Sequence, residues 1–296
     1  MNNQIFSPHK RGKSPNPKNI VRKQVKSKTT ILQKSHFNLI SLFKSSTKTF
    51  QNPEFRDYME DITLTQHSFM KDANKHLFAI FDGHGGDESA KMCQSLFPDI
   101  FSRLIKEAPF NVEQNLKKSF QILDDEAKKR KFKNLGNTAT VIYITNKTLF
   151  CANVGDSSCV IVFNDCAKKV SIDHKATDPN EIKRIESSGG KVVDERLNGI
   201  LAVSRGIGDF DMKNSGLSCE PAVYKTLIDE TTEYCVIASD GIWDVMKPED
   251  IFKICKRDQN PDIIVESIVD EAIERESEDN ISCIVICLKE PTTSKK

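Results

Sequence analysis

Apolar runs rich in Val and Ile recur along the chain and predict β-strands. The clearest covers residues 77–81 and ends at Asp82 and Gly83, which indicates a buried strand followed by a turn. Five further runs have the same character and length: 140–144, 149–154, 160–163, 233–238 and 281–288. Two of the gaps between them, 145–148 and 155–159, are short enough for hairpins, so we expect antiparallel pairing there.

Two segments show the periodicity of an amphipathic helix. In 112–131 apolar side chains recur every three or four positions, with Asn111 as the candidate N-cap. In 261–275 a broad apolar stripe follows Pro261, which suits the first helical position, and Asn260 is the candidate cap. Strands with hairpin-length gaps and separate helices favour an α+β fold over a regular βαβ repeat.

Charge divides the chain into two parts. Residues 1–50 contain eleven Lys or Arg and no acid, whereas 51–296 hold 32 basic and 42 acidic residues, a net charge of −10. The first segment is poor in periodic apolar residues, so buried surface cannot offset the entropy lost on ordering it. We therefore predict a basic, disordered N-terminal extension at 1–50, a folded domain at 51–290 and a short flexible C-terminal tail at 291–296. An apolar patch at 39–43 is left open as a first strand, a docking segment or neither.

The cysteines and the N-terminal residues bear on the compartment. The chain has nine cysteines, an odd number with no C-x-x-C pair, and several lie in apolar runs where thiols behave as small hydrophobes. The start lacks the apolar core of a secretory signal, and no apolar run approaches the ~20 residues that cross a bilayer. We expect a cytoplasmic or nuclear protein without membrane association, with a mitochondrial location as the alternative. The lysines of 1–50 are spread out, so we expect no nucleic-acid binding and instead a solvated segment or one that docks an acidic partner.

Carboxylates gather near the ends of the predicted strands. Neighbouring carboxylates repel one another and raise each other's pKa unless a cation lies between them, and Mg²⁺ and Mn²⁺ prefer oxygen ligands. An Asp-Gly pair alone is an ordinary turn signal. The acids concerned are Glu60, Asp61, Asp82, Asp156, Asp240, Asp244 and Asp279. They predict a metal site only if the folded chain brings them close together.

Seven short motifs occur in order between residues 54 and 288. They are R-D-Y-M-E-D at 56–61, D-G-H-G-G at 82–86, G-N-T-A at 136–139, A-N-V-G-D-S at 152–157, L-A-V-S-R-G-I-G-D-F at 201–210, A-S-D-G-I-W-D-V-M at 238–246 and E-D-N-I-S at 278–282. This series resembles the protein phosphatase 2C family, which are metal-dependent serine/threonine phosphatases. A series spread over most of the chain is far more specific than a single short motif.

The resemblance implies two packed antiparallel β-sheets flanked by α-helices, with two Mg²⁺ or Mn²⁺ ions at one end of the sandwich. It implies that Asp82 bridges the ions, that Glu60 and the carbonyl of Gly83 bind one, and that Asp240 and Asp279 bind the other. A water between the ions would attack the phosphorus directly, without a covalent phosphoenzyme. Residues 51–290 would then be the catalytic domain.

The resemblance also assigns supporting roles around these ions. Asp61 and Asp156 would orient bound waters, and Asp156, Asp240 and Asp244 would hold a third, looser ion. Arg56 would bind the substrate phosphate, because its planar guanidinium matches phosphate oxygens. His84 would protonate the leaving serine or threonine oxygen. The partners implied are phosphoprotein substrates, and the chain is expected to be a monomer.

Other positions in the motifs are assigned to loop support, the core or the surface rather than to chemistry: Thr138, Asp173, His174, Arg205, Asp209, Trp243, Arg184 and Arg196. Three departures from the family pattern bear on the site. Glu54 replaces a Gly before Arg56, Ser158 replaces an Arg after the G-D-S, and Gly206 with Ile207 replaces Ala-Leu. None removes a ligand, but they question the loop shape near Arg56 and the support of Asp156.

Rival chemistries require other motifs. A cysteine-nucleophile phosphatase needs an Arg six positions after its Cys, and no cysteine here has one. The aspartyl-phosphate class needs D-x-D-x-T/V, whereas D-F-D-M-K at 209–213 ends in Lys. A kinase is disfavoured because the sequence contains no glycine-rich nucleotide-binding loop. The alternative from another class is a catalytically weak or inactive relative that acts as a phosphoprotein-binding regulator.

Overall fold

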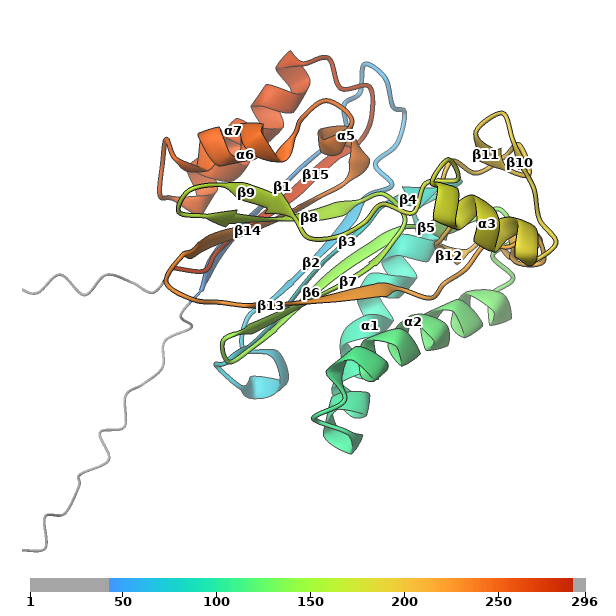
Figure 1. Cartoon of the computed structure of the whole chain (residues 1–296), viewed down its shortest axis with the longest axis horizontal. Helices are drawn as coiled ribbons and strands as arrows, with labels where there is room; N and C mark the ends of the chain where they lie inside the picture. Colours follow the sequence, from blue (N-terminus) through green and yellow to red (C-terminus); the bar gives the residue numbers. More distant parts are fainter. Residues whose placement is uncertain (1–42, 290–296) are drawn as a thin grey trace, which may run out of the picture. The chain divides into compact units, whose positions relative to one another are not determined.

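Two antiparallel five-stranded sheets form the centre of the computed structural model, which describes residues 43–289 (Figure 1). In the first sheet the strand order is β1 (Lys44–Phe50), β15 (Ile281–Cys287), β14 (Thr232–Ala238), β8 (Ser158–Phe163) and β9 (Ala167–Lys169). In the second it is β13 (Ala222–Leu227), β7 (Thr148–Val154), β6 (Ala139–Thr145), β3 (Lys75–Phe81) and β2 (Ile62–Gln66).

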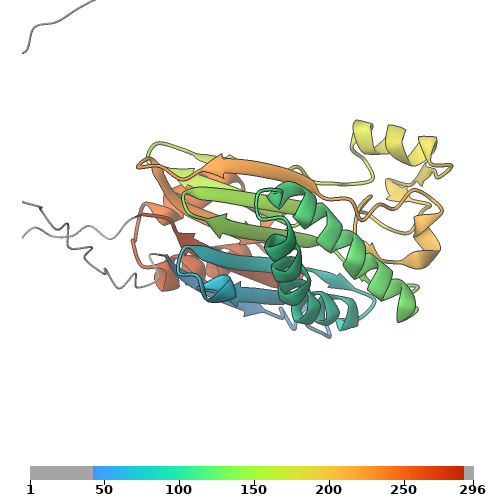
Figure 2. The same ribbon diagram turned by 90° about the horizontal axis from the view of Figure 1, so that it is seen from below.

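Helices cover the outer face of each sheet, so the fold is a four-layer sandwich (Figures 1 and 2). The second sheet carries α1 (Glu88–Glu107) and α2 (Val112–Lys129). The first sheet carries α6 (Pro248–Cys255), α7 (Pro261–Glu274) and the short α5 (Asp240–Trp243). The predicted α+β class, with two packed antiparallel sheets flanked by helices, is confirmed.

Strand β3 shows why its sequence is continuously apolar. Leu77, Ala79 and Phe81 pack against the α1 and α2 layer, whereas Phe78 and Ile80 pack between the two sheets. A strand that is covered on both faces must be apolar at every position, since successive side chains point to opposite faces. The alternation expected of a half-exposed strand is therefore absent.

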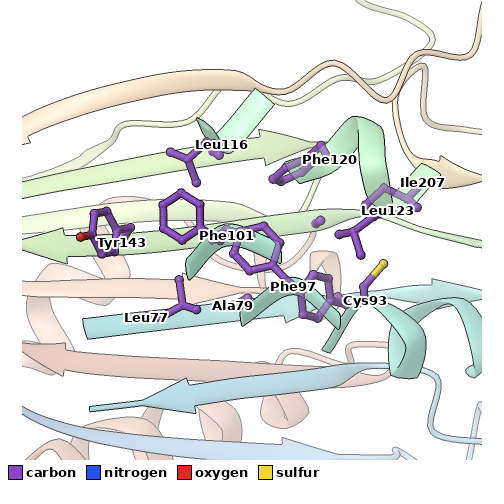
Figure 3. Close-up of a cluster of buried hydrophobic side chains, with 14 of the residues drawn as sticks. Leu77, Ala79, Cys93, Phe97, Phe101, Leu116, Phe120, Leu123, Tyr143 and Ile207 are labelled. Atoms are coloured by element: carbon purple, nitrogen blue, oxygen red, sulfur yellow. The ribbon is translucent and has the colours of Figure 1, made fainter. Parts of the chain in front are cut away.

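Aromatic side chains fill the layer between the second sheet and its helices (Figure 3). The rings of Phe97 and Phe101, both on α1, stack with centroids 5.5 Å apart, and Phe120 of α2 meets Phe97 edge-on at 6.1 Å. Tyr143 of β6 meets Phe101 edge-on at 5.0 Å. All four side chains are buried, so this layer fixes α1 and α2 on the sheet that carries Asp82.

The six predicted strands and both predicted helices are confirmed. Asn260 caps α7 by accepting a hydrogen bond from the backbone N–H of Asp262, whereas the side chain of Asn111 makes no capping bond to α2. The helix α1 was not predicted. It contains Pro98 in its interior and begins directly after the glycine-rich turn at 85–86, and both features obscure a helical pattern.

The predicted boundary at residue 50 is wrong. Strand β1 lies within the segment assigned to the extension, and all seven of its residues pair with β15. Its sequence, K-S-S-T-K-T-F, is polar because β1 is the edge strand and is only partly buried. The domain therefore begins no later than Lys44. The patch at 39–42, the remainder of the extension and the tail after 289 lie outside the described residues.

Smaller elements gather at one end of the sandwich (Figure 1). Three two-residue strands, β12 (Ile207–Gly208), β5 (Gly136–Asn137) and β4 (Gly83–His84), form a small sheet there. Near them lie α3 (Pro179–Ser187) and the hairpin of β10 (Val192–Val193) and β11 (Arg196–Leu197), which share a small apolar cluster. A four-residue helix, α4 (Phe210–Lys213), follows β12. A 3₁₀ turn, η1 (Phe69–Lys71), follows β2 at the opposite end of the sandwich (Figure 1).

Two findings bear on the expected compartment. None of the helices between residues 43 and 289 combines the length and apolar character that a membrane span requires. The nine cysteines all fall within this range and are all free thiols. No compartment follows from these findings.

Candidate metal centre

Both large sheets deliver acids to the same end of the sandwich. Asp82 directly follows β3 of the second sheet, and Asp240, the first residue of α5, follows β14 of the first sheet after Ser239. Asp279 lies two residues before β15, Asp61 directly precedes β2, and Asp156 lies between β7 and β8. Each of these positions lies at or near the end of a strand, where the chain must turn and a carboxylate can leave the core.

The electrostatics show that these acids meet. Burial and then repulsion from Asp240, Asp61, Asp156 and Asp279 hold the pKa of Asp82 well above its ordinary value. The pKa of Asp240 is raised well above its ordinary value by burial and by repulsion from Asp156 and Asp279, among others. Like charges so close together favour the binding of a cation between them.

Asp61 is the most enclosed of the set, with an exposed fraction of 3%. Its Oδ2 accepts a hydrogen bond of 2.8 Å from Ser239 Oγ, but its Oδ1 is buried without a hydrogen-bond partner among residues 43–289. Burial raises the pKa of Asp61 to about 7, although the nearby hydroxyl groups of Ser282 and Ser239 lower it. A buried carboxylate oxygen without a partner is costly, and a cation or a cation-bound water would satisfy it.

Gly83 is required by space. A Cβ at this position would lie 2.7 Å from the carbonyl oxygen of Glu60 and 3.2 Å from that of Gly86. The backbone of Gly83 therefore runs close to that of Glu60, the other residue predicted to bind the same ion. The constraint at this position is therefore the close approach of two segments of the backbone.

The oxygen-only donor set fits Mg²⁺ or Mn²⁺. Within residues 43–289, however, no group of three or more His, Cys, Asp or Glu side chains has the geometry to bind a metal ion. Protein groups engage several of the oxygens: Arg56 pairs with Asp279, and Glu60 Oε1 accepts a 2.5 Å hydrogen bond from the backbone N–H of Gly86. The assignment of individual ligands remains a prediction.

Asn280 holds the segment that carries Arg56 and Glu60, a role that the sequence analysis missed. Its Nδ2 donates to the carbonyl oxygens of Gln51 at 2.8 Å and Tyr58 at 3.0 Å, and its Oδ1 accepts from the backbone N–H of Glu60 at 2.8 Å. The only available signal was its place in E-D-N-I-S. These bonds bring residues 51–60 against the start of β15 and so place Arg56 beside Asp279.

Lys175 occupies the position predicted for a third ion. Its Nζ lies 3.3 Å from Asp244 Oδ1 and 3.9 Å from Asp156 Oδ2. Burial raises the pKa of Asp156 to about 6, although the positive charge of Lys175 acts to lower it. The structure therefore brings Asp156 and Asp244 together, but with an ammonium group between them.

His84 and Asp209 form a second polar pair at this end of the molecule. His84 Nε2 lies 2.6 Å from Asp209 Oδ2, and the Asp209 side chain is only 4% exposed. Burial lowers the pKa of His84, but the hydrogen bond and charge of Asp209 outweigh it, so the pKa is raised. Asp209 is predicted to support a loop, and in the structure it contacts His84, the predicted proton donor.

Most of the other motif residues have structural roles. Thr138 Oγ1 lies 2.9 Å from Ser157 Oγ, Trp243 Nε1 donates to the Ala238 carbonyl at 2.8 Å, and His174 is buried. Arg184 and Arg205 both bind Glu181 and backbone carbonyls, so neither is free to reach substrate, whereas Arg196 is exposed on β11.

The positions that depart from the family pattern are accommodated. Ser158 is fully buried, and its Oγ donates to Asp173 Oδ1 at 2.5 Å. Asp173 in turn pairs with Lys169 at 2.6 Å. Ile207 is buried in the core against α2, and Glu54 is exposed. Position 158 therefore carries a buried hydroxyl that binds Asp173, in place of an arginine.

Comparisons with known proteins agree with this arrangement. The family profile described as Protein phosphatase 2C matches residues 46–281. Probable protein phosphatase 2C 17 of Arabidopsis thaliana is 36% identical over 239 residues, which cover 77% of this chain and 83% of the relative. Probable protein phosphatase 2C 44 of Oryza sativa subsp. japonica is 35% identical over 241 residues, which cover 77% and 73%.

Solved structures share the fold. A sex determining protein of C. elegans matches with a TM-score of 0.77 and 26% identity, over 85% of this chain and 66% of that one. Serine-threonine phosphatase 2C from Toxoplasma gondii matches with a TM-score of 0.72 over 83% of this chain and 94% of that one, at 20% identity. With the acids of six of the seven ordered motifs at one end of this sandwich and relatives above 30% identity along most of its length, the chain belongs to the protein phosphatase 2C family.

Proposed function

We propose that the protein is a metal-dependent protein serine/threonine phosphatase, which hydrolyses phosphoserine and phosphothreonine by direct attack of water. The observation that carries this proposal is that both sheets place acids from distant segments at one end of the sandwich, around Asp82. Family membership supports the same activity. An ordinary structural role would not gather so many carboxylates without matching bases.

The metals would lie among oxygen donors. Glu60 and the carbonyl of Gly83 would hold one Mg²⁺ or Mn²⁺ ion, Asp240 and Asp279 the other, and Asp82 would bind both. Such a pair of ions supplies a nucleophilic water at neutral pH and stabilises charge on the phosphate oxygens. Asp61, whose Oδ1 has no hydrogen-bond partner in the described part of the chain, would orient a water beside them.

Two other side chains complete the reaction. Arg56 would exchange its contact with Asp279 for the phosphate group and hold it by paired hydrogen bonds. His84 would donate a proton to the serine or threonine oxygen as its bond to phosphorus breaks. The oxygen of the attacking water becomes part of inorganic phosphate, and the water releases a proton to solvent. The alcohol leaves with the proton from the imidazole, which then takes up a proton from solvent.

Phosphoproteins are the substrate class that follows, and a monomer without nucleic-acid or membrane partners remains our prediction. The alternative, an inactive relative that only binds phosphoproteins, would be expected to lack one of the predicted ligands. All of them are present in the sequence.

The test is phosphate release from a phosphothreonine peptide by the purified full chain with Mn²⁺, with Mg²⁺ and with a chelator. We expect metal-dependent turnover that is lost in the Asp82→Asn, Asp240→Asn double variant and kept in Asp270→Asn. Asp270 is an exposed acid on α7, so it controls for loss of charge alone. Folded protein that released no phosphate with either metal, yet retained phosphopeptide on a column, would favour the binding-only alternative.

A further inference from the structure

The small sheet β12-β5-β4 places two polar side chains next to each other. His84 of β4 pairs with Gly136 of β5, and Gly136 pairs on its other side with Gly208 of β12. Asp209 directly follows Gly208 in the chain. Three short strands from segments more than 50 residues apart therefore align His84 and Asp209 across a single glycine.

The contact between the two side chains is close and enclosed. His84 Nε2 lies 2.6 Å from Asp209 Oδ2, and the carboxylate is 4% exposed whereas the imidazole is 33% exposed. Asp209 thus lies behind the ring, and the ring keeps one side towards solvent. The backbone N–H of Asp209 is itself fixed by a 3.1 Å hydrogen bond to the carbonyl of Leu135.

Two further features show that the pair is a built arrangement. The backbone of Asp209 has φ 49° and ψ 54°, in the left-handed region that costs a non-glycine residue free energy. A Cβ at Gly136 would lie 1.9 Å from Asp209 Oδ2 and 2.7 Å from His84 Nε2. Position 136 must therefore lack a side chain for the two groups to meet.

We propose that Asp209 is a positioning residue for His84, holding the imidazole by its Nε2–H so that Nδ1 is directed to the leaving oxygen of the substrate. This inference rests on the proposed phosphatase function. In a neutral imidazole only one nitrogen carries hydrogen, and a carboxylate beside Nε2 selects the tautomer with hydrogen there. The proton that the leaving oxygen takes is then the second one, on Nδ1, and Nε2–H stays bonded to Asp209 throughout.

The choice of leaving group tests this role. A serine or threonine alkoxide must be protonated as it departs, whereas p-nitrophenolate is stable without a proton. General acid help is typically worth about 10²–10⁴ in rate. We expect Asp209→Asn to lower kcat on a phosphothreonine peptide at least about tenfold but on p-nitrophenyl phosphate less than about threefold, with KM little changed. Asn tolerates the left-handed backbone, so this variant keeps the fold.

Three further variants complete the design. Adding Asp209→Asn to His84→Ala should not lower kcat on the peptide any further, because Asp209 acts through His84. Gly136→Ala, which displaces the carboxylate by steric contact, should show the same dependence on the leaving group. Asp211→Asn, an exposed acid two positions along, should behave as wild type. The Mn²⁺-induced rise in Tm should be equal in Asp209→Asn and wild type.

Equal losses on both substrates, or additive losses with His84→Ala, would overturn the positioning role. A wild-type protein inactive on both substrates would instead count against the proposed function. In that case the tautomer of His84, measured by ¹⁵N NMR, tests the positioning role independently of activity. We expect hydrogen on Nε2 in wild type and a mixture of tautomers in Asp209→Asn. The same tautomer in both proteins would refute it.

Discussion

Glu181 of α3 joins two arginines, and its replacement gives a quantitative test of the structure. Its carboxylate, 6% exposed, accepts hydrogen bonds from Arg205 Nη2 at 2.6 Å, Arg184 Nε at 2.9 Å and Ser204 Oγ at 2.6 Å. These contacts tie α3 to the segment that leads to Asp209. Glu181→Gln keeps the size of the side chain and removes its charge.

The magnitude follows from the pKa of this group. Although burial opposes it, hydrogen bonds from Arg205, Arg184 and Ser204 lower the pKa of Glu181 from 4.5 to about 2. Each tenfold change in proton affinity is worth about 1.4 kcal/mol, so the charged form contributes roughly 3 kcal/mol at neutral pH. Solvent reaches the arginines, whose side chains are 27% and 19% exposed, and screens part of this. We expect Glu181→Gln to lower the free energy of unfolding by about 2 kcal/mol.

The pH dependence has a definite sign. A carboxyl group whose pKa is depressed in the folded state contributes stability above its unfolded pKa, here near 4.5. That contribution is lost as the pH falls from about 4.5 towards 2. The difference in stability between wild type and Glu181→Gln should therefore be constant from about pH 7 to 6 and fall below half by about pH 3.

Urea unfolding followed by the fluorescence of Trp243, the single tryptophan, measures this difference. The matched control is Glu186→Gln, an exposed acid on the same helix, which should change stability by less than about 0.5 kcal/mol. If Glu181→Gln were as stable as wild type near neutral pH, or if the difference were the same at pH 3, the ion-pair network would not have the energetic role argued here.

Three more outcomes are expected. Lys175→Met removes the ammonium between Asp156 and Asp244, so calorimetric titration with Mn²⁺ should detect a weak additional ion that wild type binds less well; equal titration curves would show that the lysine does not compete. Asp82→Asn relieves repulsion among the acids, so thermal unfolding without metal should occur a few degrees higher, while stabilisation by Mn²⁺ is reduced; a lower metal-free Tm would contradict this. Asn260→Ala removes the cap of α7 and should cost about 1 kcal/mol in urea unfolding, whereas no loss would show that the cap is dispensable.

The sequence by itself determined the elements whose burial is complete. The runs at 77–81, 140–144 and 281–288 are apolar on both faces because each lies between a helical layer and the other sheet. A pattern of that kind reports burial directly, whatever the partner strand is. The ordered motifs likewise identified the family, because each preserves the residues at a strand end or turn.

The tertiary structure alone decided features that depend on partners far away in the chain. Strand β1 is polar and becomes a strand only by pairing with β15, more than 200 residues later. Lys175 lies between Asp156 and Asp244, and Asp209 contacts His84, because separate segments bring these charged groups within 4 Å of one another. Local sequence encodes burial and turn chemistry, but charge pairing depends on distances that exist only once the two sheets have packed.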